Sequence, residues 1–82
     1  MTLKELENLV IGDYVACLKT NNPYAVIAGV PVEQFPLKIT GELPECTGDK
    51  QVKRLVVISV STKSFHNLPI IDFSGLNFLI KV

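Results

Sequence analysis

The residue types that most often carry out chemistry in proteins are scarce in this sequence. His66 is its only histidine, and its two cysteines, Cys17 and Cys46, lie far from His66 along the chain. A Cys–His or Ser–His catalytic pair would have to be built around that single imidazole. We expect His66 to lie on a surface loop, and we predict that the protein is not an enzyme.

Sites for metals and cofactors are equally hard to assemble. Two cysteines and one histidine without a CxxC spacing do not make a zinc site, and the five glycines form neither a GxGxxG nor a P-loop pattern. Glu33, Glu42, Glu45 and Asp49 cluster loosely, but none lies in the kind of apolar run that turns a carboxyl into a general acid. Asp72 does have apolar neighbours, and we interpret it as a turn or strand-end residue. No cofactor and no metal ion are predicted.

The charges of the chain balance. Eight Lys and Arg residues are matched by eight Asp and Glu residues, so the formal net charge is zero. A protein dedicated to nucleic acid usually carries a basic excess that displaces counterions from phosphates. The only local basic group is Lys50, Lys53 and Arg54, which we interpret as the solvated start of a strand. We therefore do not expect the chain to bind DNA or RNA by itself.

Length and composition predict one small, apolar domain. The 82 residues fit a single domain, 1–82, near the lower size limit for one apolar core. With 48% hydrophobic and 20% charged residues, part of the surface is expected to be covered by a partner. No apolar run reaches the roughly 18 residues of a membrane span, and the charged start, Met1 to Glu7, does not resemble a secretory signal. We expect an intracellular location, in the cytoplasm or the nucleus, with reduced cysteines and with Cys17 as a small core residue.

The first ten residues carry the signature of a short helix. Thr2 and Glu5 have the spacing of a capping box, and Leu3, Leu6 and Val10 share one helical face. Two turns of helix are unstable by themselves, so we expect this face to dock onto the rest of the domain.

Alternating apolar residues predict that most of the remaining chain is β. Residues 13–19 are expected to form a strand covered on both faces, followed by an Asn-rich turn at Thr20 to Pro23. The next strand runs from Tyr24 to Val30 or Val32. Gly29 and Pro31 are expected to bend it sharply, because glycine in a strand marks a bulge and proline cannot donate to a ladder.

The second half of the chain shows the same alternation. The expected elements are a strand at 35–40 with Phe35, Leu37 and Ile39 inward, a polar loop at 41–50, the longest strand at 51–62, a loop at 63–69 and one or two short strands at 70–82. In the longest strand, Val56, Ile58 and Val60 alternate with Val57, Ser59 and Ser61. One short N-terminal α-helix followed by five or six curved strands predicts a mainly β protein, a small and strongly bent β-barrel.

This order of elements resembles the Sm-like (LSm) fold, a bent five-stranded barrel capped by an N-terminal helix. The apolar positions of that family's first motif match Tyr24, Ala28, Phe35 and Ile39. Three positions do not match, since Val26, Val32 and Pro36 stand where the family has Gly, Asp and Asn. The Arg-Gly pair of the second motif falls in VISVSTKSFHNL, which contains neither residue. SH3-like barrels show much the same alternation, so both folds remain open.

The resemblance also implies a mode of binding. In Sm-like proteins the residues missing here hold a base of single-stranded RNA, so direct RNA binding is not implied for this chain. What remains is the pairing of protein subunits, in homo- or hetero-oligomers, through strand edges. The C-terminal run either joins the barrel or pairs with a partner. The candidate interface residues alternate along it and are Leu76, Phe78, Ile80 and Val82.

Two functions are therefore expected as alternatives. The first is a non-catalytic Sm-like assembly subunit, similar to accessory Sm-like proteins of the ribonucleoprotein-assembly machinery. The second is a stand-alone SH3-like barrel that binds a peptide or a nucleic acid. An exposed aromatic groove would favour the second, and its candidate residues are Tyr14, Tyr24, Phe35, Phe65, Phe73 and Phe78.

Overall fold

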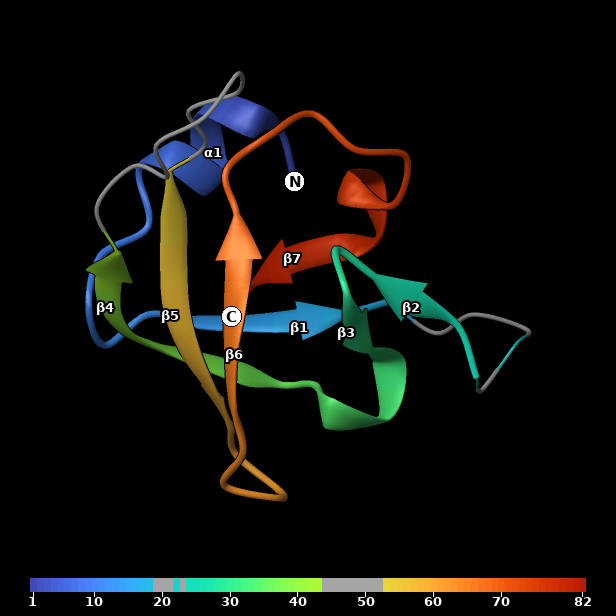
Figure 1. The fold of residues 1–82 in the computed structure, drawn as a ribbon. Coiled ribbons are helices and arrows are strands. Elements are labelled where there is room, and N and C mark those ends of the chain that lie inside the picture. The colour runs from blue at the N-terminus through green and yellow to red at the C-terminus, as the bar shows by residue number, and fades with distance from the viewer. Residues whose placement is uncertain (19–21, 23, 44–52) are drawn as a thin grey trace.

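The chain folds into antiparallel β-structure with a short α-helix at its N-terminal end (Figure 1), as predicted. The computed structural model describes residues 1–18, 22, 24–43 and 53–82. The elements in this part, with η marking 3₁₀-helices, are α1 (Leu3–Glu7), β1 (Tyr14–Cys17), β2 (Val26–Ile27), β3 (Val30–Pro31), η1 (Val32–Gln34), β4 (Leu37–Leu43), β5 (Arg54–Ser59), β6 (Phe65–Pro69), η2 (Leu76–Phe78) and β7 (Leu79–Lys81).

The main sheet contains five strands in the order β6-β5-β4-β1-β7, and β2 and β3 form a separate two-stranded sheet. The long strand β4 joins the two halves of the main sheet. It pairs with β1 through Leu37 and Lys38 and with β5 along its whole length, with a register shift between Ile39 and Gly41. The β5–β6 hairpin runs across the direction of β1 and β7, so the sheet wraps around its own inner face (Figure 1). Strands β6 and β7 form its two edges, and within the described residues no strand pairs with their outer sides.

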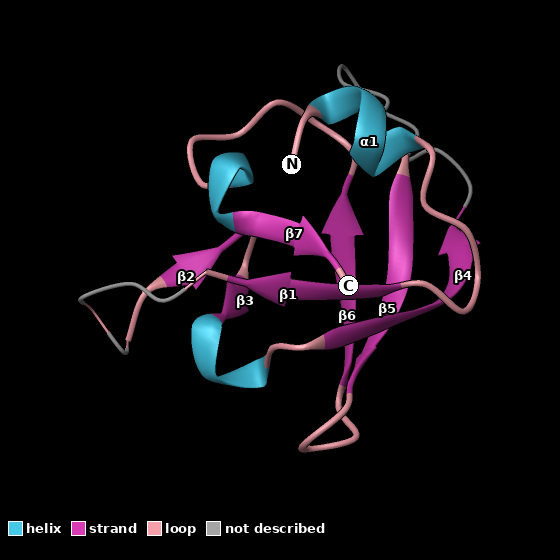
Figure 2. Cartoon of the chain, turned by 180° about the vertical axis from the view of Figure 1, so that it is seen from behind, coloured by secondary structure: helices cyan, strands magenta, loops and turns pink. Residues whose placement is uncertain are grey.

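The predicted capping box at the start of α1 is confirmed. The Glu5 backbone N–H donates to Thr2 Oγ1 at 3.2 Å, and the Thr2 N–H donates to Glu5 Oε1 at 3.3 Å. The predicted apolar face is only partly right, because Leu6 is fully buried whereas Val10 is exposed. The helix ends at Glu7, so helical spacing no longer applies, and Leu9 takes the buried position instead. Figure 2 shows α1 at the end of the molecule where β5 begins, opposite the β5–β6 turn.

The core lies on the inner face of the wrapped sheet. Alternation along the strands selects its residues, as in β5, where Leu55, Val57 and Ser59 are buried and Val56 and Ile58 are only half-buried. The buried apolar set is Leu6, Leu9, Val15, Ile27, Val30, Leu37, Ile39, Leu55, Val57, Leu68, Leu76 and Leu79. The predicted inward residues of 35–40 are confirmed, with Leu37 and Ile39 fully buried and Phe35 packed against the core.

The predicted continuous strand at 24–32 is wrong, because this segment is a tight hairpin. Val26 pairs with Pro31 and Ile27 pairs with Val30. The two residues between them, Ala28 and Gly29, both have positive φ values, +53° and +82°. Two consecutive left-handed residues are typical of the type I′ turn, which matches the twist of a two-stranded ribbon. Gly29 thus reverses the chain where a bend was expected.

The predicted loop at 63–69 is wrong from Phe65 onward, and only Lys63 and Ser64 belong to a connection between strands. Residues Phe65–Pro69 form β6, which pairs with β5, and Leu68 is fully buried opposite Leu55. A turn with Lys63 at a φ of +62° connects the two strands. The strand has only one fully buried side chain, so its sequence shows little apolar alternation.

Other predicted boundaries shift. The first strand covers Tyr14–Cys17, and its outer side is exposed rather than covered. Strand β4 continues through Gly41 to Leu43, and with seven residues it is longer than β5, which has six. At the C-terminal end, Leu76–Phe78 form the 3₁₀-helix η2, and only Leu79–Lys81 are a strand. The predicted turn at Thr20 to Pro23, except for Asn22, lies outside the described residues, as does most of the predicted loop 41–50.

Replacing Gly29 with alanine is expected to destabilise the fold through backbone strain alone. A Cβ at this position would meet nothing within 4 Å, but a left-handed conformation costs an L residue about 1–2 kcal/mol. For a domain of this size, Tm should fall by about 4–16 °C in a calorimetric scan.

Gly41→Ala is the matched control, because Gly41 lies outside the left-handed region and its added Cβ would sit 3.9 Å from the Val56 Cβ, an ordinary contact. Its Tm should stay the same or rise. Equal melting temperatures for the two variants would show that Gly29 does not occupy a turn of this type.

Candidate protein-binding surface

The outer side of β1 and β7 carries a row of exposed apolar side chains. Val15 is opposite Lys81, Ala16 is opposite Ile80 and Cys17 is opposite Leu79. The same register continues past both ends, where the Leu18 N–H donates to the Phe78 carbonyl at 2.7 Å and the Val82 N–H donates to the Tyr14 carbonyl at 3.0 Å. Cross-strand partners share a face. We call the resulting set the β1–β7 surface: Tyr14, Ala16, Leu18, Phe78, Ile80 and Val82.

Five of these six side chains are large, apolar and exposed. Val82 is the most exposed of them, with 73% of its surface accessible to solvent. They are exposed because the alternate residues of the same strands, Val15 and Leu79, point into the core. Contiguous exposed apolar groups of this kind are typical of binding surfaces.

Three of the four predicted interface residues lie on this surface. Phe78, Ile80 and Val82 are exposed there, whereas Leu76 is buried at 6% exposure. The predicted single strand from 76 to 82 fails at Leu76 because η2 turns the chain before β7 begins, and Leu79 takes the fully buried position. Pairing of β7 with β1 makes this strand part of the domain's own sheet. Tyr14 and Leu18 complete the surface, and the alternation of residues 13–19 already places them on one face.

The free edge of β6 presents unpaired backbone groups. Hydrogen bonds at its two ends, from Ser59 N–H to the Ser64 carbonyl and from Ile70 N–H to the Lys53 carbonyl, are both 2.8 Å long. In antiparallel pairs such bonds recur at every second residue, so His66 and Leu68 bond to β5. The backbone groups of Phe65, Asn67 and Pro69 therefore point away from the sheet. Pro69 lacks an N–H at a position where that group would have no partner, as expected for an edge strand.

The edge of β7 is shorter and more protected. The same alternation points the backbone groups of Leu79 and Lys81 away from β1. The Leu79 carbonyl already accepts a 2.7 Å hydrogen bond from the Met1 ammonium. The Lys81 side chain lies 3.6 Å from the Asp13 carboxylate, and a lysine on an edge strand disfavours pairing.

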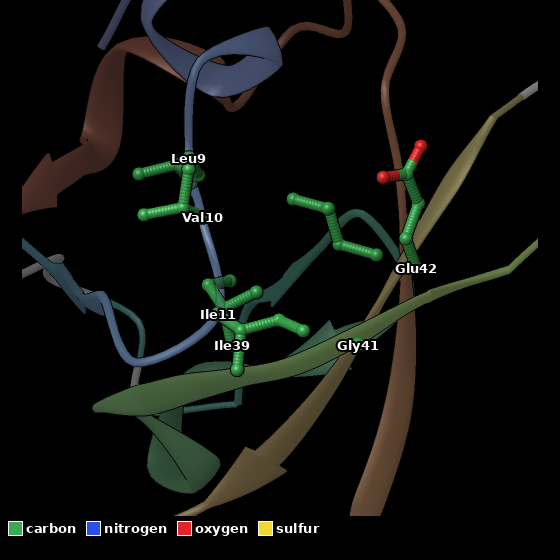
Figure 3. Close-up of a pocket in the computed structure, with 7 residues that line it drawn as sticks. Leu9, Val10, Ile11, Ile39, Gly41 and Glu42 are labelled. Atoms are coloured by element: carbon green, nitrogen blue, oxygen red, sulfur yellow. The ribbon is translucent and has the colours of Figure 1, made fainter.

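A hollow with an apolar lining, shown in Figure 3, opens between β4 and the segment that follows α1. Its volume is about 420 Å³, and it is lined by Leu9, Val10, Ile11, Ile39, Gly41, Glu42 and Leu55. The one charged lining residue, Glu42, forms an ion pair with Lys53. With so few polar groups, the hollow can take up an apolar side chain but has little with which to orient a polar ligand.

A second hollow of about 280 Å³ lies between β2 and η2. The two sides of this hollow pack closely at Gly75 and Ile27. A Cβ added to Gly75 would lie 3.1 Å from Ile27 Cγ2. Of the aromatic residues expected to form a groove, Phe73 and Phe78 line this hollow. The others are dispersed, with Phe35 against the core and Tyr14, Tyr24 and Phe65 exposed elsewhere.

Several polar side chains that could take part in chemistry form a hydrogen-bonded cluster around the β5–β6 turn. His66 lies in β6, so its predicted loop position is wrong, and its Nε2 is 3.4 Å from Gln34 Oε1. That amide oxygen also accepts a 2.6 Å bond from the Thr62 hydroxyl, and buried Ser59 donates to the Gln34 carbonyl at 2.7 Å. These contacts tie η1 to the turn.

The other titratable candidates are scattered. Glu33, Glu42 and Asp72 are exposed, while Glu45, Asp49 and Cys46 lie outside the described residues. Within the part of the chain that the structure describes, no three His, Cys, Asp or Glu side chains are grouped to hold a metal ion. Nor is any helix in that part long and apolar enough to cross a membrane.

Comparison with known proteins gives no relative: no protein-family model matches the sequence, and no curated protein and no solved structure matches it significantly.

Cys17 lies half-buried on the inner side of β1, where its thiol donates to the Leu18 carbonyl at 3.4 Å. Burial raises the pKa of this thiol, because the charged thiolate is poorly solvated there. The folded state therefore favours the neutral thiol. The stability from this preference is complete below the ordinary thiol pKa and is lost as the pH rises through the raised one.

We expect iodoacetamide to alkylate Cys17 more slowly in the folded chain than in the chain unfolded in urea at the same pH, because the thiolate is the reactive form. Peptide mapping by mass spectrometry separates Cys17 from Cys46. Equal rates for Cys17 in the two states would contradict the protection inferred from burial.

Proposed function

We propose that this chain is a non-catalytic subunit that binds other protein subunits through the edges of its sheet. The observation that carries the proposal is the free edge of β6, where the N–H and C=O groups of Phe65 and Asn67 and the C=O group of Pro69 point outward. Such a row of backbone groups is a template for an added strand. Phe65, at 67% exposure, adds a large apolar side chain beside it.

A small Sm-like or SH3-like barrel, partly open between β6 and β7, is the fold that we propose. Support comes from the position of the last strand beside the first and from the bent strand β4 shared by both halves of the sheet. Because β6 and β7 are different edges, joining β6 of one copy to β7 of another would be a heterologous contact. Such contacts close into rings or extend into filaments.

The Sm-like resemblance suggests where such a subunit works. It supports a role in intracellular ribonucleoprotein assembly, in the cytoplasm or the nucleus, through protein contacts. Direct RNA binding is not part of the proposal, because Val26, Val32 and Pro36 stand in place of the polar residues of the family's RNA pocket and the net charge is zero.

Asn67→Pro should abolish subunit association while leaving the fold intact. The substitution removes an N–H that points away from β5, so the bonds that His66 and Leu68 make to β5 remain. Sedimentation velocity and native mass spectrometry of the purified chain, alone and with proteins that copurify with it, would measure the assembly state. Because the lost N–H makes no bond to β5, we expect the melting temperature to change little.

Two controls separate edge pairing from folding. Asn67→Ala keeps the N–H and should assemble like the unaltered chain, whereas His66→Pro removes a bond to β5 and should unfold. If the folded Asn67→Pro chain assembles with the same partners as the unaltered chain, or if the unaltered chain has no partner of any kind, the edge proposal is wrong.

A second candidate function is the binding of an extended, proline-rich peptide by an SH3-like barrel. The hollow between β2 and η2 favours it, because two aromatic side chains, Phe73 and Phe78, line it and proline-rich segments dock in aromatic-lined grooves.

Phe78→Ala should then weaken the binding of a synthetic proline-rich peptide at least about tenfold, since truncating an aromatic anchor at a hot spot costs about 2 kcal/mol or more. Phe65→Ala, an exposed aromatic on another strand, is the matched control and should bind normally. Fluorescence anisotropy measures both. The absence of binding by the unaltered chain, or an equal loss in both variants, would remove this candidate.

A further inference from the structure

A single row of outward side chains crosses the main sheet from edge to edge. The register places Phe65 opposite Ile58, Ile58 opposite Lys38, and Lys38 opposite Tyr14. The hydrogen bond from the Val82 N–H to the Tyr14 carbonyl adds Val82 at the β7 edge. Because directly paired residues share a face, all five side chains lie on the side of the sheet away from the core. We call this set the outer row: Phe65, Ile58, Lys38, Tyr14 and Val82.

Among the described residues, the charged side chains at outward strand positions of the main sheet are all basic, although the net charge of the chain is zero. Lys38 and Arg54 stand at outward positions of β4 and β5. The acidic residues Asp13 and Glu42 occupy core-side positions at strand ends, where they pair with Lys81 and Lys53. Within the described residues, neither Lys38 nor Arg54 has a carboxylate partner. The face therefore presents cations among apolar groups.

Lys38 is held in the middle of the row. Its Nζ lies 5.8 Å from the centroid of the Tyr14 ring, and its side chain is half-buried between Tyr14 and Ile58. The ring and the neighbouring strands place this cation beside the apolar side chains of the row, where an incoming carboxylate can pair with it.

We infer that the outer row binds an extended, acidic and apolar segment of a partner protein. A carboxylate of that segment pairs with Lys38, and its apolar side chains contact Ile58, Tyr14 and Phe65. Measured along the curved sheet, five strands at about 4.8 Å spacing make a row of about 19 Å, so a segment of roughly six extended residues that follows the curve would cover it. A nucleic acid fits less well, because Lys38 covers a face of the Tyr14 ring that a base would need, and two cations give little counterion release. This inference uses the face of the sheet and does not depend on edge pairing.

The test uses two blocked six-residue peptides and the full chain labelled for NMR. One peptide has valine, glutamate and valine at its first, third and fifth positions, which share a face in an extended chain, with serine at the positions between them, and the other has lysine in place of the glutamate. The acidic peptide should shift the backbone amides of Tyr14, Lys38 and Ile58, and its affinity should fall several-fold from about 0.05 M to about 0.5 M salt. The basic peptide should leave those amides unchanged.

Variants of Lys38 complete the test. Lys38→Glu should weaken binding of the acidic peptide by about tenfold or more, since attraction becomes repulsion. Lys38→Met should abolish the preference for the acidic over the basic peptide. Lys4→Glu on α1 makes the same charge change away from the row and should have no effect, and Asn67→Pro should also bind normally. Equal binding of both peptides, no effect of Lys38→Glu, or tighter binding of oligouridylate at the same amides would overturn the inference.

Discussion

The bend of β4 is the constraint on which the rest of the structure depends. This one strand pairs with β1 at its start and with β5 along its length, so both halves of the sheet must follow its course. The register shift between Ile39 and Gly41 adds a residue to one side of the ladder, and bulges of this kind increase local bending and twist. At this point the Thr40 hydroxyl donates a 3.1 Å hydrogen bond to the Val56 carbonyl, so a side chain links the two strands at the register shift. Without the bend, the sheet could not wrap around Leu37, Ile39 and Val57.

Because the sheet wraps, alternate side chains along its strands face either the core or the outside. One set forms the core, and the alternate set is left outside because a chain of 82 residues has few elements with which to cover it. In the described part, the only α-helix covers one end of the molecule. Part of this outer set is contiguous, because Tyr14, Ile80 and Val82 are neighbours across β1 and β7. Other exposed apolar side chains, such as Val10 and Tyr24, lie elsewhere.

The two sheet edges differ for physical reasons that can be read from individual residues. On β7, the Met1 ammonium and the Lys81–Asp13 ion pair occupy part of the edge. On β6, Pro69 sits at an outward position where its missing N–H removes no bond to β5, and the outward groups of Phe65 and Asn67 remain available for an added strand. Edge pairing and binding by the outer face are thus separate properties of the same sheet, one based on backbone hydrogen bonds and the other on side chains.

Local chemistry in the sequence determined the capping box at Thr2 and Glu5, the inward positions of Leu37 and Ile39, and the common face of Tyr14 and Leu18, because each depends on residues a few positions apart. Tertiary contacts decided the rest. Strand β6 forms from a segment with one fully buried side chain because β5 lies beside it. Leu76 is buried although Phe78, two positions on, is exposed, because η2 turns the chain before β7 begins. The sequence places Phe65, Ile58, Lys38, Tyr14 and Val82 in five separate segments, and only the pairing register brings them into one row, because hydrogen bonds between strands fix which distant residues become neighbours.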